Sequence, residues 1–113
     1  MVLLLITIDL KDEYLGGALF KLDEILGSLD AQEGYCAHSV NRDLSNKAQL
    51  LLIIEWKNEA AAKRYLQEIE FKLLVETIKT IGKKYAGSLA GVLSHGGAEL
   101  AEGQPVSPLQ EAT

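Results

Sequence analysis

The chain has 113 residues, 48% of them hydrophobic and 24% charged, which is typical of one soluble globular domain. Its formal net charge of −5 argues against a nucleic-acid partner, because such proteins normally carry a basic patch. No apolar segment approaches the roughly 20 residues of a membrane helix, so we expect no membrane attachment. With Cys36 as the only cysteine, an internal disulfide and a cysteine-based metal cluster are excluded, and we expect a protein of the reducing cytoplasm.

The first part of the chain predicts a strand, a helix and a second strand. Val2–Asp9 is apolar almost throughout and predicts the first strand. Asp12 offers an oxygen that could cap a helix, and apolar residues then recur at helical spacing until Gly27–Gly34, where we expect the helix to end. The weak alternation of "GYCAHSVNRD", Gly34–Asp43, predicts the second strand, in which Cys36 is expected to be a small buried hydrophobe.

The second part of the chain predicts a strand, a helix and a further strand. "AQLLLIIEW", Ala48–Trp56, is the third strand. Asn58 is placed to cap the second helix, whose apolar period is disturbed near Ile69, where we expect a kink. Gly82 suits the end of this helix, and Ala86–His95 predicts a fourth strand.

This element order predicts an α+β fold. The order β-α-β-β-α-β is that of a ferredoxin-like sandwich, in which an antiparallel four-stranded sheet carries both helices on one face. The phrase "IDLKDE" at Ile8–Glu13 returns as "IEWKNE" at Ile54–Glu59, as expected if each half of the fold ends a strand and opens a helix in the same way. We assign residues 1–95 to this domain. Residues 96–113 are rich in Gly, Pro, Ser and Glu without periodicity, and we predict a flexible C-terminal tail there.

The two strands predicted for the middle of the sheet are unusually apolar. They read "VLLLI" and "LLLII", whereas a strand covered on one face alternates between apolar and polar residues. The two helices of one chain cover one face only, and a bare second face would be a contiguous apolar patch of a kind that monomers rarely expose. We therefore predict a homodimer whose sheets pack face to face about 10 Å apart and bury on the order of 2,000 Å².

Three stretches of the sequence resemble a known family. They are Gly34, "NRD" at Asn41–Asp43 and "IIEWKNEAAAKRYLQEIEFKLL" at Ile53–Leu74. Together they resemble the antibiotic-biosynthesis-monooxygenase-like domains of the dimeric α+β barrel superfamily, over about residues 2–95. In that family an apolar strand runs into a Trp, and the following helix carries an Ala and then a Phe; Trp56 and Phe71 occupy two of these places.

The resemblance implies a cofactor-free monooxygenase that oxidises a small phenolic or quinol compound, or a related enzyme acting on a carbonyl compound, in an apolar pocket between sheet and helices. Some positions depart from the family pattern. Ile54 stands where many members have Glu, and Tyr65 stands where many have His. The haem-degrading branch requires a His at the position of Val75, which cannot ligate iron, so we expect neither haem degradation nor a cofactor.

Five residues are candidates for the site. His38 and Tyr65 are the candidate catalytic groups, as a base active near neutral pH and as a hydroxyl that orients a substrate oxygen. Thr7, Trp56 and Phe71 are the candidate substrate contacts. Each has a structural alternative: Tyr65, Trp56 and Phe71 could be ordinary core residues, His38 could face a partner chain, and Thr7 could bond a backbone carbonyl or water.

Two further readings of the sequence concern metals and non-catalytic functions. His38 and His95 have no third ligand at a recognisable spacing, so we expect no metal site. A non-catalytic dimer that binds a small ligand or another protein remains the alternative to an enzyme, because fold alone does not decide function. An RNA-binding module would need stacking aromatic residues on its central strands, and these strands have none.

Overall fold

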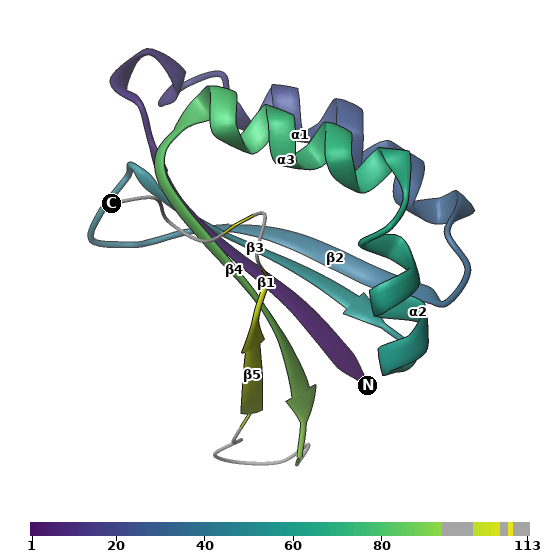
Figure 1. The fold of residues 1–113 in the computed structure, drawn as a ribbon. Coiled ribbons are helices and arrows are strands. Elements are labelled where there is room, and N and C mark those ends of the chain that lie inside the picture. The colour runs from purple at the N-terminus through teal and green to yellow at the C-terminus, as the bar shows by residue number, and fades with distance from the viewer. Residues whose placement is uncertain (94–100, 107–108, 110–113) are drawn as a thin grey trace.

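The computed structural model describes residues 1–93, 101–106 and 109. Figure 1 shows one layer of helices on one face of a sheet. The elements in chain order are β1 (Val2–Leu10), η1 (Asp12–Tyr14), α1 (Ala18–Leu26), η2 (Gly27–Ala31), β2 (Tyr35–Arg42), β3 (Gln49–Trp56), α2 (Glu59–Tyr65), α3 (Ile69–Ile81), β4 (Gly82–Val92) and β5 (Ala101–Pro105).

The sheet confirms the predicted topology and adds a strand to it. Its order is β2-β3-β1-β4-β5, and all neighbouring strands are antiparallel. β1 and β3 are adjacent and central, with Ile6 opposite Leu52. The predicted β-α-β-β-α-β order and the α+β class are therefore confirmed, with the helices on one face of the sheet.

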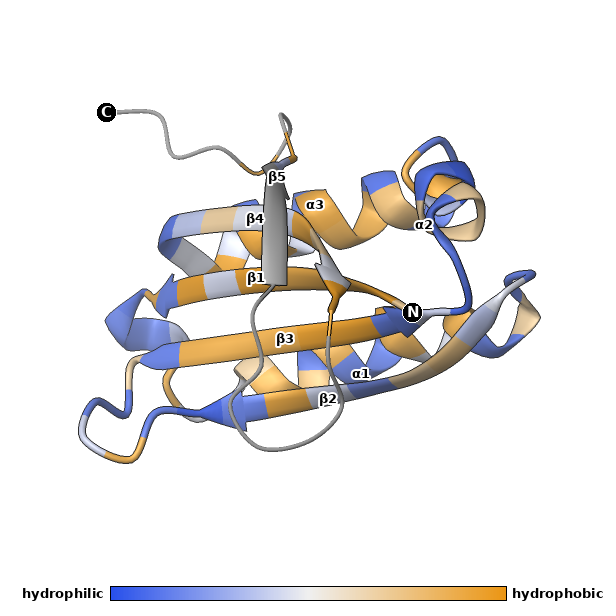
Figure 2. Cartoon of the chain, turned by 90° about the horizontal axis from the view of Figure 1, so that it is seen from below, coloured by the Kyte–Doolittle hydropathy of each residue, from blue (hydrophilic) through white to orange (hydrophobic). Residues whose placement is uncertain are grey.

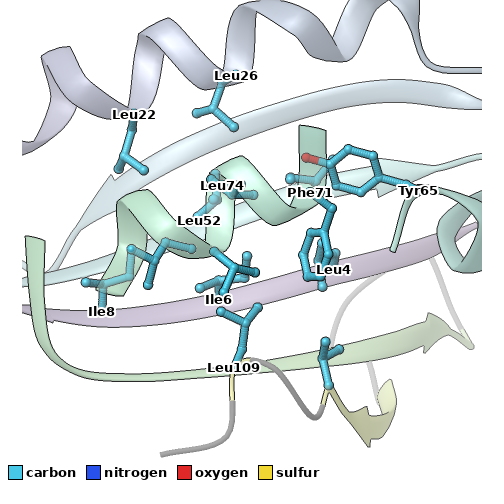
Figure 3. Packing of buried hydrophobic residues seen from close by; sticks show 14 of the residues in the cluster. Leu4, Ile6, Ile8, Leu22, Leu26, Leu52, Tyr65, Phe71, Leu74 and Leu109 are labelled. Atoms are coloured by element: carbon cyan, nitrogen blue, oxygen red, sulfur yellow. The ribbon is translucent and has the colours of Figure 1, made fainter. Parts of the chain in front are cut away.

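The two faces of the sheet differ in burial. In β1 and β3 every second side chain is buried beneath the helices, as Figure 3 shows for Leu4, Ile6, Ile8 and Leu52. The residues between them point to the other face, which we call the open face. Leu3, Leu5, Leu51 and Ile53 are half-buried there, and Figure 2 shows β1 and β3 with no helix in front of them.

The first helix begins later than predicted. Asp12 does not cap it: this residue starts the short 3₁₀ turn η1, and α1 begins only at Ala18. Its N-cap is Gly17, which offers no side-chain hydrogen bond. Gly16 and Gly17 explain the delay, since glycine costs about 1 kcal/mol relative to alanine inside a helix.

The second helix is divided. Asn58 caps α2 as predicted, because its Oδ1 accepts the backbone N–H of Ala61 at 2.8 Å. The expected kink near Ile69 is a complete break, with residues 66–68 between α2 and α3. The break resets the helical phase, so the apolar side chains of Ile69 and Leu73 are 60% and 49% exposed. α3 then runs directly into β4, four residues before the predicted start of that strand.

The C-terminal stretch corrects the prediction of a flexible tail. β5 pairs with β4, the Val106 N–H donates to the Gly87 carbonyl at 2.9 Å, and Leu109 is fully buried in the core (Figure 3). Gly87 makes room for Leu109, because a Cβ there would lie 2.6 Å from Leu109 Cδ1. The composition of the segment does not predict β5, because this strand is held by backbone pairing with β4, which does not depend on side-chain type. The rest of the predicted tail and His95 lie outside the described residues, and the boundary at residue 95 stays a prediction.

Candidate functional site

Four aromatic rings form a continuous row where the sheet meets α2 and α3. Tyr35 meets Trp56 edge-on, with ring centroids 6.1 Å apart. Trp56 packs against Tyr65 at 4.8 Å, and Tyr65 meets Phe71 at 5.5 Å. We call these four residues the aromatic cluster. Three of the five predicted site residues, Trp56, Tyr65 and Phe71, are thus brought together.

The fold places each of these rings through a short-range feature. Tyr35 begins β2 and lies opposite Trp56, the last residue of β3. Tyr65 ends α2, and Phe71 lies in the first turn of α3. The break between the two helices therefore turns the Tyr65 and Phe71 rings toward each other, as Figure 3 shows.

Two buried polar atoms, one in the aromatic cluster and one on the neighbouring Glu70, lack hydrogen-bond partners among the described residues. Trp56 Nε1 and Glu70 Oε2 are buried, and neither has a hydrogen-bond partner within the described chain. An unpartnered buried polar atom costs about 1–3 kcal/mol. Burial, and secondly the charge of Glu70, raise the pKa of Tyr65 well above its ordinary value of 10.0, so its hydroxyl stays protonated. The Trp56 indole N–H and one Glu70 carboxylate oxygen thus lie buried without a partner among the described residues, and Glu70 acts on the nearby Tyr65 hydroxyl.

Glu70 was not identified from the sequence. An acidic residue in the first turn of a helix is common, because it complements the helix dipole. Its position gives no sign that one oxygen is buried near Tyr65. The burial of this oxygen follows from the break at residues 66–68, which sets the direction in which the side chains of α3 point.

His38 is linked to the aromatic cluster through Tyr35. It lies opposite Ile54 on the helix-facing side of β2, but its side chain is exposed because β2 is an edge strand. The Tyr35 hydroxyl lies 2.6 Å from His38 Nδ1. Tyr35, which the sequence reasoning missed, therefore stands between His38 and the buried rings. Cys36, expected to be buried, is exposed, because the pairing register of β2 shifts at that point.

Thr7 lies away from the other predicted site residues. It belongs to the open face, where its hydroxyl donates to the Ala86 carbonyl at 3.4 Å. It also lines a cavity of about 400 Å³, which we call the sheet groove; the other lining residues are Asn41, Arg42, Asp43, Leu44, Gln49, Leu50 and Leu51. The expectation that Thr7 shares one pocket with Tyr65 is wrong, because the sheet separates them.

One carboxyl group that lines the sheet groove, that of Asp43, has a shifted pKa. Hydrogen bonds from the Ser45 hydroxyl and backbone N–H lower the pKa of Asp43, which is fully exposed.

Across residues 1–93, 101–106 and 109, no three His, Cys, Asp or Glu side chains come together as a metal site. Within the same residues, no helix is both long and apolar enough to cross a membrane.

Solved structures share this fold. A mutant of SnoaB, a cofactor-independent oxygenase from Streptomyces nogalater, has a TM-score of 0.75 at 13% identity, over 83% of this chain and 94% of that chain. Rv0793 from Mycobacterium tuberculosis has a TM-score of 0.71 at 12% identity, over 85% and 98%. An antibiotic biosynthesis monooxygenase has a TM-score of 0.70 at 18% identity, over 83% and 100%. These likenesses show the fold.

Comparison with curated proteins found no match. Comparison with family models did: the model of the antibiotic biosynthesis monooxygenases matches residues 1–77, well over half of the chain. This range includes the complete aromatic cluster and Glu70. The resemblance seen in the sequence is confirmed, and the chain belongs to the antibiotic biosynthesis monooxygenase family.

Proposed function

We propose that the protein is a cofactor-independent monooxygenase that oxidises a small phenolic or quinol compound at the aromatic cluster. The observation that carries this proposal is the pair of buried, unpartnered atoms, Trp56 Nε1 and Glu70 Oε2, in the surroundings of Tyr65. A monooxygenase-like or small-ligand-binding role is what the family and the fold support.

Each group has a defined part in this reaction. The Glu70 carboxylate takes the phenolic proton, because a phenolate transfers an electron to oxygen far more readily than a phenol does. The Trp56 N–H and the Tyr65 hydroxyl donate hydrogen bonds to the phenolate oxygen and stabilise its charge. Exclusion of water protects the anion while it reacts. A hydroquinone and O₂ then yield a hydroxyquinone and one water, so the substrate supplies its own electrons.

The cluster is closed in the free protein. Trp56, Tyr65 and Phe71 are each at most 2% exposed. Substrate entry therefore requires the elements that cover these rings to move. We propose that the short junction at residues 66–68, between α2 and α3, is the part that moves, and that the substrate ring then replaces contacts between these rings. His38 bonds Tyr35 instead of lying beside Tyr65, so the proposed base is Glu70.

Oxygen consumption with a panel of hydroquinones and naphthols tests the proposal. Glu70→Gln keeps the shape but removes the base, which contributes about 10²–10⁴-fold in typical enzymes. Trp56→Phe removes the N–H donor, with an expected loss of about 10²–10³-fold in kcat. Thr7→Ala, on the open face, is the matched control and should leave the rate unchanged. Absence of oxygen uptake, or full activity in Glu70→Gln, would contradict the enzyme proposal.

A ligand-binding dimer without chemistry is the second candidate, and the sheet groove supports it. The groove lies on the open face and is lined by neutral polar groups such as Thr7, Asn41 and Gln49, by one residue of each charge, Arg42 and Asp43, and by leucine side chains. Trp56, the only tryptophan, reports ligands at the aromatic cluster through its fluorescence. Binding that leaves this fluorescence unchanged, is weakened by Thr7→Ala and gives no oxygen uptake would favour the second candidate.

In both candidates we propose a homodimer formed through the open face. A second copy would cover Leu3, Leu5, Leu51 and Ile53, which are half-buried in the single chain. Sedimentation over a dilution series should find a dimer for the wild type and a monomer for Leu51→Lys. Phe20→Lys is the control, since Phe20 is 73% exposed on α1 at the opposite side. A monomeric wild type would refute the dimer.

A further inference from the structure

The aromatic cluster continues to the protein surface through a tyrosine–histidine pair. Trp56 is fully buried, Tyr35 is half-buried and His38 is exposed, so the three residues lead outward from the core. The Trp56 and Tyr35 rings are in edge contact, and the Tyr35 hydroxyl lies 2.6 Å from His38 Nδ1. Tryptophan and tyrosine are the side chains most easily oxidised by one electron, and electron transfer between touching rings is fast.

We propose that Trp56, Tyr35 and His38 form a path that carries an oxidising equivalent from the buried core to the surface. The path goes beyond the proposed oxygenase reaction and requires no substrate. It would act whenever a one-electron oxidant, such as a radical derived from oxygen, removes an electron from the buried rings.

The first step of the path follows from the surroundings of Trp56. Oxidation turns its indole into a radical cation, which in most sites loses its N–H proton to a nearby acceptor. Trp56 Nε1 has no hydrogen-bond partner among the described residues. The radical cation therefore keeps its proton, remains strongly oxidising and takes an electron from a neighbouring ring.

Two tyrosines touch Trp56, and the structure favours Tyr35 as the donor. A tyrosine gives up an electron readily only if its hydroxyl proton can leave at the same time. Tyr35 has an acceptor within hydrogen-bond reach: in the tautomer of His38 that carries its proton on Nε2, Nδ1 accepts from the Tyr35 hydroxyl. No imidazole among the described residues is hydrogen-bonded to the Tyr65 hydroxyl. Burial raises the pKa of both Tyr35 and Tyr65, so the hydrogen-bonded acceptor is what distinguishes the two tyrosines. Tyr65 is the closer ring at 4.8 Å, and the charge of Glu70 acts on it. Among the described residues, however, no hydrogen bond joins its hydroxyl to a base, whereas the Tyr35 hydroxyl is already paired with His38.

The transfer balances in electrons and protons. Trp56 regains one electron from Tyr35, the O–H bond of Tyr35 breaks, and the proton moves to His38 Nδ1. Tyr35 becomes a neutral phenoxyl radical beside an imidazolium. A soluble reductant of the thiol or ascorbate class then supplies an electron, and the proton returns from His38 to Tyr35.

Flash photolysis of the whole protein tests the path without any substrate. A flash at a wavelength that only tryptophan absorbs ionises Trp56, and a scavenger removes the ejected electron. In the wild type, the tryptophanyl absorption should decay as an equal amount of tyrosyl radical appears, at a rate independent of protein concentration. Tyr35→Phe should abolish this fast phase, whereas Tyr65→Phe should retain it.

Two variants of His38 test whether it accepts the proton of Tyr35. His38→Gln retains a hydrogen-bond acceptor but not the base, and should slow the transfer by about a hundredfold, at the lower end of what a positioned proton acceptor contributes. Added imidazole should restore the rate in His38→Gly, an effect that a structural role alone would not produce. Tyr14→Phe is the control for a tyrosine remote from Trp56.

Three results would overturn the inference. They are a fast phase unchanged in Tyr35→Phe, a fast phase lost in Tyr65→Phe while Tyr35 is intact, or a rate insensitive to His38→Gln. Equal urea midpoints for each variant and the wild type would show that the variants are folded. Oxygen uptake with hydroquinones is measured separately, so failure of the enzyme proposal and failure of this path are distinguishable.

Discussion

Gly34 is the position where one methyl group should have the largest effect beside the aromatic cluster. It precedes Tyr35 and is the only described residue with a left-handed backbone, at φ +84°. A Cβ added to it would lie 2.3 Å from the Cβ of Ala61 in α2. The Gly34 carbonyl also accepts the Lys57 N–H at 2.8 Å, so the backbone is held on both sides. We therefore expect Gly34→Ala to destabilise the protein and to push α2 away from the sheet.

The magnitude follows from two penalties and one gain. A left-handed alanine costs about 1–2 kcal/mol, and overpacking costs typically about 1–3 kcal/mol. The smaller entropy of the unfolded chain returns about 0.4–1 kcal/mol. The free energy of unfolding of Gly34→Ala should fall by about 3 kcal/mol, a large part of the roughly 5–15 kcal/mol of a native domain.

Urea unfolding followed by Trp56 fluorescence measures this loss, and two further variants separate its causes. Ala61→Gly removes the steric partner at a cost of about 1 kcal/mol in helix propensity. On that background Gly34→Ala should cost only the backbone penalty, about 1–2 kcal/mol. Gly27→Ala is the control, because Gly27 has a helical backbone and open space around it. Equal effects of Gly34→Ala and Gly27→Ala would refute the steric reasoning.

Three other predictions concern a cap, the C-terminal segment and pH. Asn58→Ala removes the bond to the Ala61 N–H and should lower the free energy of unfolding in urea by about 1 kcal/mol; an unchanged value would contradict the cap. Leu109→Ala should cost about 2–5 kcal/mol, because Leu109 is fully buried, whereas Leu93→Ala, at a residue 61% exposed, should cost under about 0.5 kcal/mol. Equal losses of stability in Leu109→Ala and Leu93→Ala would contradict the burial of Leu109 in the core. The raised pKa of Tyr65 means that the folded state holds the phenolic proton more tightly than the unfolded state, so stability should be fully present below the ordinary value of 10.0 and fall as pH rises above it. Unfolding in urea at several alkaline pH values should show this slope in the wild type and a flatter one in Tyr65→Phe.

The sequence determined the elements and their order, because strands and helices are set largely by nearby residues. The apolar runs in β1 and β3, the cap at Asn58 and the Trp56 motif are all local signals, and together they led to the α+β fold and the family. The same local signals gave wrong boundaries for both predicted helices. Gly16 and Gly17 delayed α1, and the reset of the helical phase beyond Tyr65 was read as a kink.

Tertiary structure alone decided which residues meet. Thr7 and Tyr65 both looked like site residues, but alternation along a strand does not say which face is covered, and the sheet separates them. Tyr35 reaches Trp56 only through the pairing of β2 with β3, and Glu70 reaches Tyr65 only through the angle between two helices. Leu109 is buried because β5 pairs with β4. Each of these contacts depends on register or packing that neighbouring residues do not encode.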